Sequence, residues 1–205
     1  MTAEAVVVGA VNAGKSLFAV NFAGWLGQGV VRVERVVAEE GGESGSGTAR
    51  WSVDRARHAL VSAGPHKTLR PVVLVVPFSA GSATPVLRLV DTPSLVDGVP
   101  EREDVRRAMV DTLRWLERPA FVLHVVDAPR AAASWEGVDR ELSSLCAPRG
   151  GYALLANKTD LAGAGDGVRR LRRDLPGHQV IGVSALTRRG FPHVLRVLSR
   201  HLAPR

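Results

Sequence analysis

The sequence predicts an α/β fold in which a mostly parallel sheet lies between two layers of helices. Short apolar runs alternate with segments whose apolar residues recur at helical spacing. A glycine-rich stretch, residues 9–16, joins the first apolar run to the first helical segment. Only the runs at residues 72–78 and 86–90 are joined as a hairpin; helices separate most of the others, which favours parallel pairing.

The first quarter of the chain gives a strand at residues 5–8 and a helix at residues 15–26. Residues 30–37 alternate in the manner of a strand, and residues 52–62 have a helical pattern. Between them lies a stretch rich in Gly, Ser and Glu. We expect residues 27–68 to be an enlarged, mobile segment.

The rest of the chain continues the alternation. In order, it predicts strands at 72–78 and 86–90, a helix at 101–117, a strand at 121–126, a helix at 135–145, a strand at 152–156, a helix at 168–175, a strand at 180–183 and a helix at 191–202. No internal repeat is present, and residues 1–205 read as a single domain.

Composition excludes several classes of protein. The 205 residues are 45% hydrophobic and 23% charged, which is typical of a globular domain. No apolar run approaches the roughly 20 residues of a membrane-spanning helix, and no signal peptide is recognisable. The lone Cys146 favours a small buried side chain rather than a disulfide. A reducing, cytoplasmic location is expected.

The glycine-rich stretch reads G-x-x-x-x-G-K-S and predicts a phosphate-binding loop. Its backbone N–H groups and the following helix N-terminus favour a nucleoside triphosphate. Lys15 is expected to reach the β- and γ-phosphates and Ser16 to hold Mg²⁺. The expected nucleotide contacts in this loop come from Asn12, Ala13, Gly14, Lys15, Ser16 and Leu17. Asp91, at the end of a predicted strand, is the candidate to hold Mg²⁺ through water.

A second motif, Asn157-Lys158-Thr159-Asp160, follows the 152–156 strand and predicts guanine as the base. The Asp160 carboxylate can accept from two guanine N–H groups, which adenine cannot offer. Lys158 can lie against the base, and Asn157 can tie this loop to the phosphate loop. After the last strand, Ser184-Ala185-Leu186 is expected to bring the Ala185 N–H near the guanine oxygen.

These motifs resemble the small P-loop GTPases of the translation-factor class, closest to the TrmE–Era–EngA–EngB–septin group. Residues 12–16 match its N-x-G-K-S loop, residues 91–93 its D-T-P-G motif and residues 157–160 its N-K-x-D motif. The resemblance implies a three-layer G domain whose six-stranded sheet has one antiparallel strand. It also implies GTP hydrolysis, switching between GTP and GDP states, and pairing through the nucleotide face.

The chain departs from that pattern in two places, at position 94 and in the length of the segment before switch I. Ser94 stands where the group has the glycine of D-x-x-G, and Leu95 stands where Ras-like enzymes keep a water-orienting glutamine.

The switch I threonine, a catalytic residue and Mg²⁺ ligand, is expected at Thr68, just before the 72–78 strand; Thr48 is the more distant alternative. The resemblance implies a K⁺ ligand at Asn12, whereas a turn former is the other interpretation. Lys67 is a rival cation. No arginine finger is evident, so intrinsic hydrolysis is expected to be slow.

The formal net charge is +7, which permits a ribosomal or RNA partner as well as a protein partner. A basic cluster on one predicted helix either binds the phosphate backbone of a nucleic acid or is a solvated helix face; its members are Arg169, Arg170, Arg172 and Arg173.

His124 lies inside a predicted apolar strand and is interpreted as a core histidine. The sequence thus predicts a Mg²⁺-dependent GTPase switch that contributes Lys15, Asn12 and Thr68 to catalysis. The alternative is a GTP-dependent binding or assembly module with little turnover, and a nucleotide kinase is a distant third.

Overall fold

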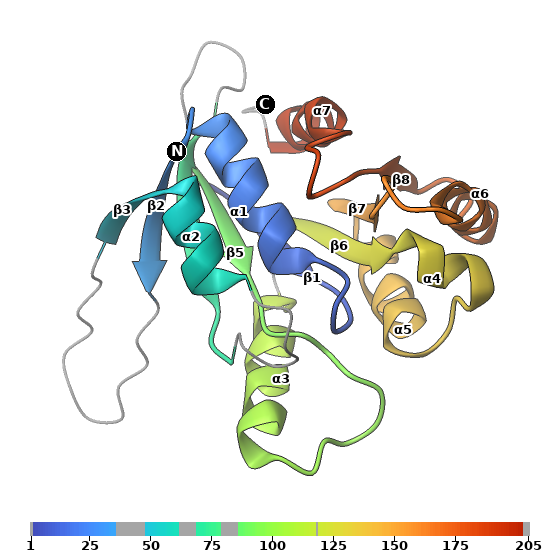
Figure 1. Ribbon diagram of the computed structural model, residues 1–205. Helices are drawn as coiled ribbons and strands as arrows, with labels where there is room; N and C mark the ends of the chain where they lie inside the picture. Colours follow the sequence, from blue (N-terminus) through green and yellow to red (C-terminus); the bar gives the residue numbers. More distant parts are fainter. Residues whose placement is uncertain (1, 36–47, 62–68, 79–85, 118, 203–205) are drawn as a thin grey trace.

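A computed structural model of the chain describes residues 2–35, 48–61, 69–78, 86–117 and 119–202. One sheet of eight strands, in the order β3-β2-β4-β5-β1-β6-β7-β8, runs through the molecule (Figure 1). The strands are β1 (Thr2–Val8), β2 (Val30–Arg35), β3 (Thr48–Ser52), β4 (Val72–Pro77), β5 (Val86–Asp91), β6 (Phe121–Asp127), β7 (Tyr152–Asn157) and β8 (Gln179–Gly182). The helices are α1 (Lys15–Leu26), α2 (Val53–Leu60), α3 (Glu103–Trp115), α4 (Ala128–Ala133), α5 (Gly137–Cys146), α6 (Ala164–Asp174) and α7 (Phe191–Leu202), with a short 3-10 helix η1 (Ala147–Arg149).

The α/β class is confirmed, but the sheet is larger than the resemblance implies. Strands β5, β1, β6, β7 and β8 are mutually parallel. β4 is antiparallel to β5, β2 to β4, and β3 to β2. The expected six strands with one antiparallel member are therefore corrected to eight strands, of which β3 and β4 oppose the rest. The reason is that residues 27–68 contribute β2 and β3 to the sheet.

Helix boundaries follow the sequence pattern at both ends of the chain, since α1 and α7 begin and end at the predicted residues. Helix α4 was not predicted. Its sequence is short and contains Pro129, which resembles a turn. The Asp127 side chain accepts from the Arg130 N–H at 3.1 Å, and proline is tolerated in a first helical turn, so this turn is a capped helix.

The sheet separates two apolar layers of the core. Ala5 and Val7 of β1 face a layer that includes α1, α2 and α7, whereas Val6 and Val8 face a layer that includes α4, α5 and α6. Because both faces of β1 are buried from Ala5 to Val8, that part of its sequence is continuously apolar, as is typical of a central parallel strand. No helix within the described residues is both long and apolar enough to cross a membrane.

The described part of the 27–68 segment is regular secondary structure. Helix α2 packs against α1, where Gly24 lies so close to Val53 that a Cβ on the glycine would sit 2.1 Å from the valine Cγ2. Ala56 is fully buried beside them. Residues 36–47 and 62–68 lie outside the described residues, and they include the expected switch I threonine Thr68 and the rival cation Lys67.

Candidate functional site

The phosphate loop follows β1, and its glycines are required by close contacts with neighbouring strands. Gly9 has φ +146°, and a Cβ there would lie 2.1 Å from the Val125 carbonyl oxygen. Gly14, at φ +91°, begins α1, and a Cβ there would lie 2.4 Å from the Asn157 amide nitrogen. Only glycine fits both the space and the backbone conformation at these two positions. The backbone of the loop is therefore free to approach a phosphate group.

Lys15 is buried beneath this loop. Its ammonium group donates to the Ala10 carbonyl and to the Ser94 hydroxyl, each at 2.7 Å. Burial lowers the pKa of Lys15 to about 8, a shift that the nearby carboxylates Asp91 and Asp139 oppose. A buried cation with only uncharged direct partners is poised to gain from an anion, because a phosphate would supply the missing charge.

Asp91 ends β5 next to Ser16 and is almost completely buried. Burial raises its pKa to about 6, while Ser16 and Lys15 offset part of the rise. Within the described residues neither carboxylate oxygen accepts a well-formed hydrogen bond. An orphaned buried carboxylate beside a hydroxyl fits the oxygen donors that Mg²⁺ requires.

The loop after Asp91 is attached to the phosphate loop through its backbone. The Leu95 N–H donates to the Gly9 carbonyl at 3.3 Å, and the Thr92 N–H and hydroxyl both donate to the Val7 carbonyl. The Leu95 side chain is buried in the core. It therefore cannot orient a water molecule, as the sequence indicated.

Asn157 connects the phosphate loop to the loop after β8. Its amide nitrogen donates to the Ala13 carbonyl at 2.8 Å, and its amide oxygen accepts from the Ala185 N–H at 2.8 Å. The expected tie between Asn157 and the phosphate loop is therefore present. The Ala185 N–H, however, donates to Asn157 rather than facing open space for a guanine oxygen. Ala185 therefore contacts the N-K-x-D motif through its backbone N–H.

Lys158 and Asp160 have different environments. The Lys158 ammonium lies 2.5 Å from the Asp127 carboxylate at the end of the adjacent strand β6. Asp160 is exposed, and within the described residues its carboxylate makes no hydrogen bond or ion pair. Leu186 is also exposed, and Ser184 is buried, its hydroxyl accepting from the Thr187 N–H. An exposed, unpaired carboxylate can receive a base.

Two of the other predicted site residues are described, and one of them is on the surface. Asn12 is exposed at φ +62° and its side chain makes no hydrogen bond within the described residues. The turn-former interpretation accounts for this left-handed backbone, which asparagine tolerates. Leu17 is half-buried in the first turn of α1. Thr48 lies on the edge strand β3, three strands away from β5 on the side opposite β1.

A buried polar network supports the phosphate loop from below and was not anticipated. Asp139 of α5 accepts from the Ala10 N–H at 3.0 Å and lies 3.1 Å from His124 Nε2. A carboxylate only accepts, so Nε2 carries the proton and Nδ1 accepts from the Tyr152 hydroxyl at 2.9 Å. Ser143 completes the chain at 2.7 Å from that hydroxyl, and burial raises the pKa of Tyr152 above its ordinary value. His124 is thus a satisfied core histidine, as predicted.

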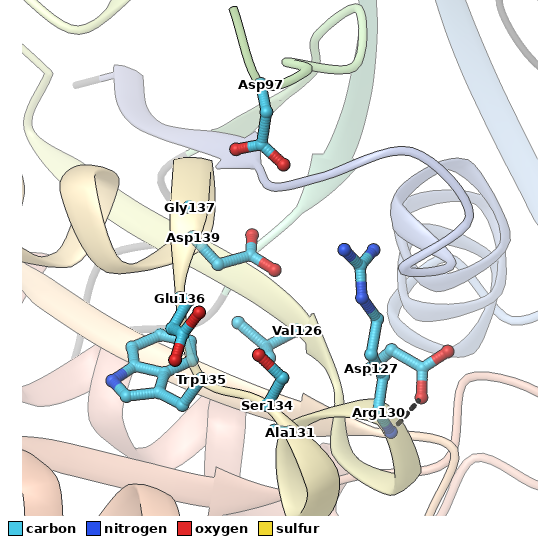
Figure 2. A pocket seen from close by; sticks show the side chains of 10 residues that line it. All are labelled: Asp97, Val126, Asp127, Arg130, Ala131, Ser134, Trp135, Glu136, Gly137 and Asp139. Atoms are coloured by element: carbon cyan, nitrogen blue, oxygen red, sulfur yellow. Dashed lines mark hydrogen bonds between the residues drawn. The ribbon is translucent and has the colours of Figure 1, made fainter.

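A cavity of about 260 Å³ lies beside this network, and Figure 2 shows its lining. Its charged members are Asp97, Asp127, Arg130, Glu136 and Asp139. Four carboxylates against one guanidinium make this cavity unsuited to a phosphate. Among the described residues, no three His, Cys, Asp or Glu side chains gather closely enough to hold a metal ion. The phosphate loop, and not this cavity, remains the candidate nucleotide site.

Two of the four arginines of α6 bond to other elements of the fold, and the other two make ion pairs on the surface. Arg170 donates to the carbonyls of Ala132 and Ala133 at the end of α4, and Arg172 reaches the Val180 carbonyl. Arg169 pairs with Asp166, and Arg173 pairs with Asp174. These pairings favour the helix-face interpretation over phosphate binding.

Comparison with known proteins gives relatives in sequence and in structure, whereas no family model matches the chain. The GTPase Obg of Desulforudis audaxviator is 31% identical over 160 residues, which cover 74% of this chain and 36% of that protein. The GTPase Obg of Heliobacterium modesticaldum is 31% identical over 156 residues, covering 72% of this chain and 34% of the relative. The chain thus spans about a third of the length of these curated relatives.

Solved structures with the same fold include GTP-binding domains. An Era variant from Aquifex aeolicus bound to GDP and AlF₄⁻ aligns over 100% of this chain and 58% of its own, with a TM-score of 0.69 and 16% identity. An Era structure in complex with MgGDPNP and a segment of 16S ribosomal RNA aligns with a TM-score of 0.66, 16% identity and the same coverage. The G domain of the T. maritima FeoB iron transporter aligns over 98% of this chain and 99% of its own, with a TM-score of 0.57 and 13% identity.

Proposed function

The chain is a small P-loop GTPase domain of the TrmE–Era–EngA–EngB–septin-like group, and from this premise we propose that it binds GTP and hydrolyses it to GDP and phosphate as a molecular switch. The observation that carries the proposal is the Asn157 side chain, which bonds both the phosphate loop and the loop after β8. A single side chain thereby sets the spacing between the expected phosphate site and the expected base site.

In this proposal the base is selected by Asp160. Its exposed carboxylate is free to accept from the two guanine N–H groups, and adenine offers no equivalent pair. The Lys158 stem lies against the base while its ammonium stays paired with Asp127. The backbone of residues 12–17 surrounds the phosphates. Leu186 covers the open side of the base.

Lys15 supplies the fixed positive charge for hydrolysis. Its pKa of about 8 leaves it mostly protonated at neutral pH, and phosphate oxygens would stabilise that form further. Mg²⁺ would be held by Ser16, by Asp91 through water and by Thr68 of switch I, and it would neutralise charge on the β- and γ-phosphates. We propose residues 1–205 as one G domain, with the 27–68 segment preceding switch I.

Leu95 is buried in the core, so it cannot orient the attacking water. Slow intrinsic turnover follows, and K⁺ bound at Asn12 is our candidate accelerator. The same burial of Leu95 favours the second candidate function, a GTP-dependent binding or assembly module with little turnover. In both candidate functions the partner can be an RNA, and one Era structure contains a segment of 16S ribosomal RNA. Because the arginines of α6 are paired, such an RNA would contact other groups, such as Arg188 and Arg189.

Both candidates are tested by GTP binding and turnover of purified protein in matched KCl and NaCl. A working switch gives turnover that KCl accelerates and that Asn12→Ala returns to the NaCl rate. Asp160→Asn should lose preference for GDP over xanthosine diphosphate while the fold, followed by circular dichroism, is unchanged. GTP binding without turnover in either salt would favour the assembly module. Failure to bind GTP would overturn both.

Size-exclusion chromatography with GDP and with a non-hydrolysable GTP analogue tests nucleotide-dependent pairing. A shift to twice the mass with the GTP analogue alone would support a dimer through the nucleotide face.

A further inference from the structure

Helix α2, in the 27–68 segment, is connected to the candidate nucleotide site through the side chain of Arg57. The Arg57 Nε donates to the Asn21 side-chain oxygen at 2.6 Å. Asn21 lies on α1 with no solvent exposure, whereas the Arg57 side chain is one-third exposed. Around this bond α2 packs on α1 through Val53 and Ala56, so the position of Arg57 is fixed by apolar contacts.

The other end of Asn21 contacts the loop expected to bind guanine. Its amide nitrogen donates to the Ala185 carbonyl at 2.6 Å. The Ala185 N–H donates in turn to Asn157. Ala185 is therefore fixed on both of its backbone polar groups, on one side by the N-K-x-D motif and on the other by α1.

Arg57 determines which way the Asn21 amide points. A guanidinium can only donate, so the asparagine oxygen must face Arg57. The amide nitrogen then faces the Ala185 carbonyl, which can only accept. Without Arg57 the amide loses the partner that fixes this orientation, and a buried asparagine oxygen is left unpaired, which is costly.

We propose that Arg57 and Asn21 are positioning residues for the loop after β8, which contains Ala185 and is expected to bind guanine. Through them the 27–68 segment governs how long the chain retains a guanine nucleotide. The continuous path runs from Arg57 through Asn21, Ala185 and Asn157 to the Ala13 carbonyl of the phosphate loop. The proposal rests on the proposed function, because the loop matters for retention only where guanine is bound.

Coupling between two sites acts in both directions. If the Arg57 contact lowers the dissociation constant of the nucleotide by slowing its release, then bound nucleotide must also stabilise the contact of α2 with α1. Backbone amides of α2 should exchange hydrogen more slowly with GDP bound, and Arg57→Ala should abolish that difference.

The test measures release of a fluorescent GDP from the full chain by stopped-flow chase with unlabelled GDP. Arg57→Ala should release GDP about three- to tenfold faster than wild type, which is the effect of losing part of a charge-assisted hydrogen bond. Arg57→Lys, which retains a donor, should recover part of the loss. The matched control is Arg55→Ala on the same helix, since Arg55 lies over the Trp51 ring 5.2 Å from its centroid and does not contact Asn21. It should release GDP at the wild-type rate.

Thermal unfolding of the nucleotide-free proteins separates positioning from general stability. Arg57→Ala should unfold at a lower temperature than Arg55→Ala, because it leaves the buried Asn21 oxygen unpaired. The positioning role is therefore judged from GDP release in a background that lacks this oxygen. Asn21→Ala and the Arg57→Ala/Asn21→Ala double variant complete the cycle, and the double variant should be no faster than Asn21→Ala alone. Equal release from wild type and Arg57→Ala, with guanine binding intact, overturns this inference and leaves the proposed function standing. Absence of GDP binding by the wild type overturns both.

Discussion

The Lys15 ammonium donates to the Ser94 hydroxyl across 2.7 Å, and this bond joins the phosphate loop to the loop that follows Asp91. The residue at position 94 is a glycine in the group that the chain resembles. Here its side chain takes one of the three Lys15 donors, and the Ala10 carbonyl takes another. One donor remains for a phosphate oxygen, so Lys15 can reach both the β- and the γ-phosphate only if Ser94 or Ala10 gives up its bond.

Removing the Ser94 hydroxyl should strengthen GTP binding. We expect Ser94→Ala to lower the GTP dissociation constant about three- to tenfold, because a bond to a charged group no longer has to be exchanged. Ser94→Gly removes the same hydroxyl and adds backbone freedom. Isothermal titration with GTP compares them. A gain with Ser94→Gly alone would assign the effect to the backbone, and no gain with either would contradict the competition.

The pKa of Asp91 predicts how stability of the nucleotide-free protein depends on pH. Its folded pKa, about 6, lies above the ordinary value of 3.8, so the folded state binds a proton more tightly than the unfolded state between pH 4 and 6. The contribution of this group to stability is therefore full at low pH and is lost as pH rises toward 6. The slope reaches at most about 1.4 kcal/mol per pH unit.

Urea denaturation in EDTA at a series of pH values from 4.5 to 7.5 measures that slope. Asp91→Asn cannot titrate and should remove the corresponding part of it. An identical pH profile for the variant and the wild type would show that Asp91 has an ordinary pKa.

The Asp139 carboxylate supports the phosphate loop, and its loss should destabilise the fold. Asp139→Ala leaves the Ala10 N–H and His124 without their acceptor, which we expect to cost about 1–3 kcal/mol in the free energy of unfolding. Asp139→Asn retains one acceptor and should cost less. Glu141→Ala is the matched control because Glu141 is exposed on the same helix. Equal stability of Asp139→Ala and Glu141→Ala in urea would contradict a supporting role.

The contact between Gly24 and Val53 predicts a compensating pair. Gly24→Ala places a Cβ 2.1 Å from Val53 Cγ2 and should destabilise the protein by about 1–3 kcal/mol. Val53→Ala provides room for that methyl group, so the double variant should be more stable than the sum of the single effects implies. Urea unfolding of all four proteins measures the coupling, and strict additivity would show that α2 is not packed against α1 in solution.

Local pattern predicted much of the fold, and tertiary contact decided the remainder. The bounds of α1 and α7 follow from helical spacing of apolar residues, and β1 from a continuous apolar run. Strand β3 was missed because its sequence, residues 48–52, contains one buried apolar side chain, Trp51, and depends on pairing with β2. Mobility was expected there because Gly and Ser precede it.

In the candidate site, too, the residues of sequence motifs were predicted and the residues that support them through long-range contacts were not. Glycine spacing and the N-K-x-D motif placed Lys15 and Asn157 beside the loops that the structure brings together. The supporting residues Asp139 and Asn21 carry no motif, because their partners Ala10 and Ala185 lie 129 and 164 residues away in sequence. The pair of Asp127 with Lys158 could have been predicted from the sequence, because Asp127 ends the strand that precedes the N-K-x-D strand in the chain and pairs with it.

The position of β1 in the sheet has a consequence for synthesis of the protein. Within the described residues β1 pairs with β5 and β6, so the strand that precedes the phosphate loop has no partner until residues 86–91 have been made and lacks its second partner until residues 121–127 follow. Asn157 and Ala185, which complete the connection between the two nucleotide loops, are made later still. A ribosome-bound chain that ends before Ala185 therefore has the phosphate loop without the rest of its site, and guanine nucleotide can stabilise the domain only after Ala185 has been made.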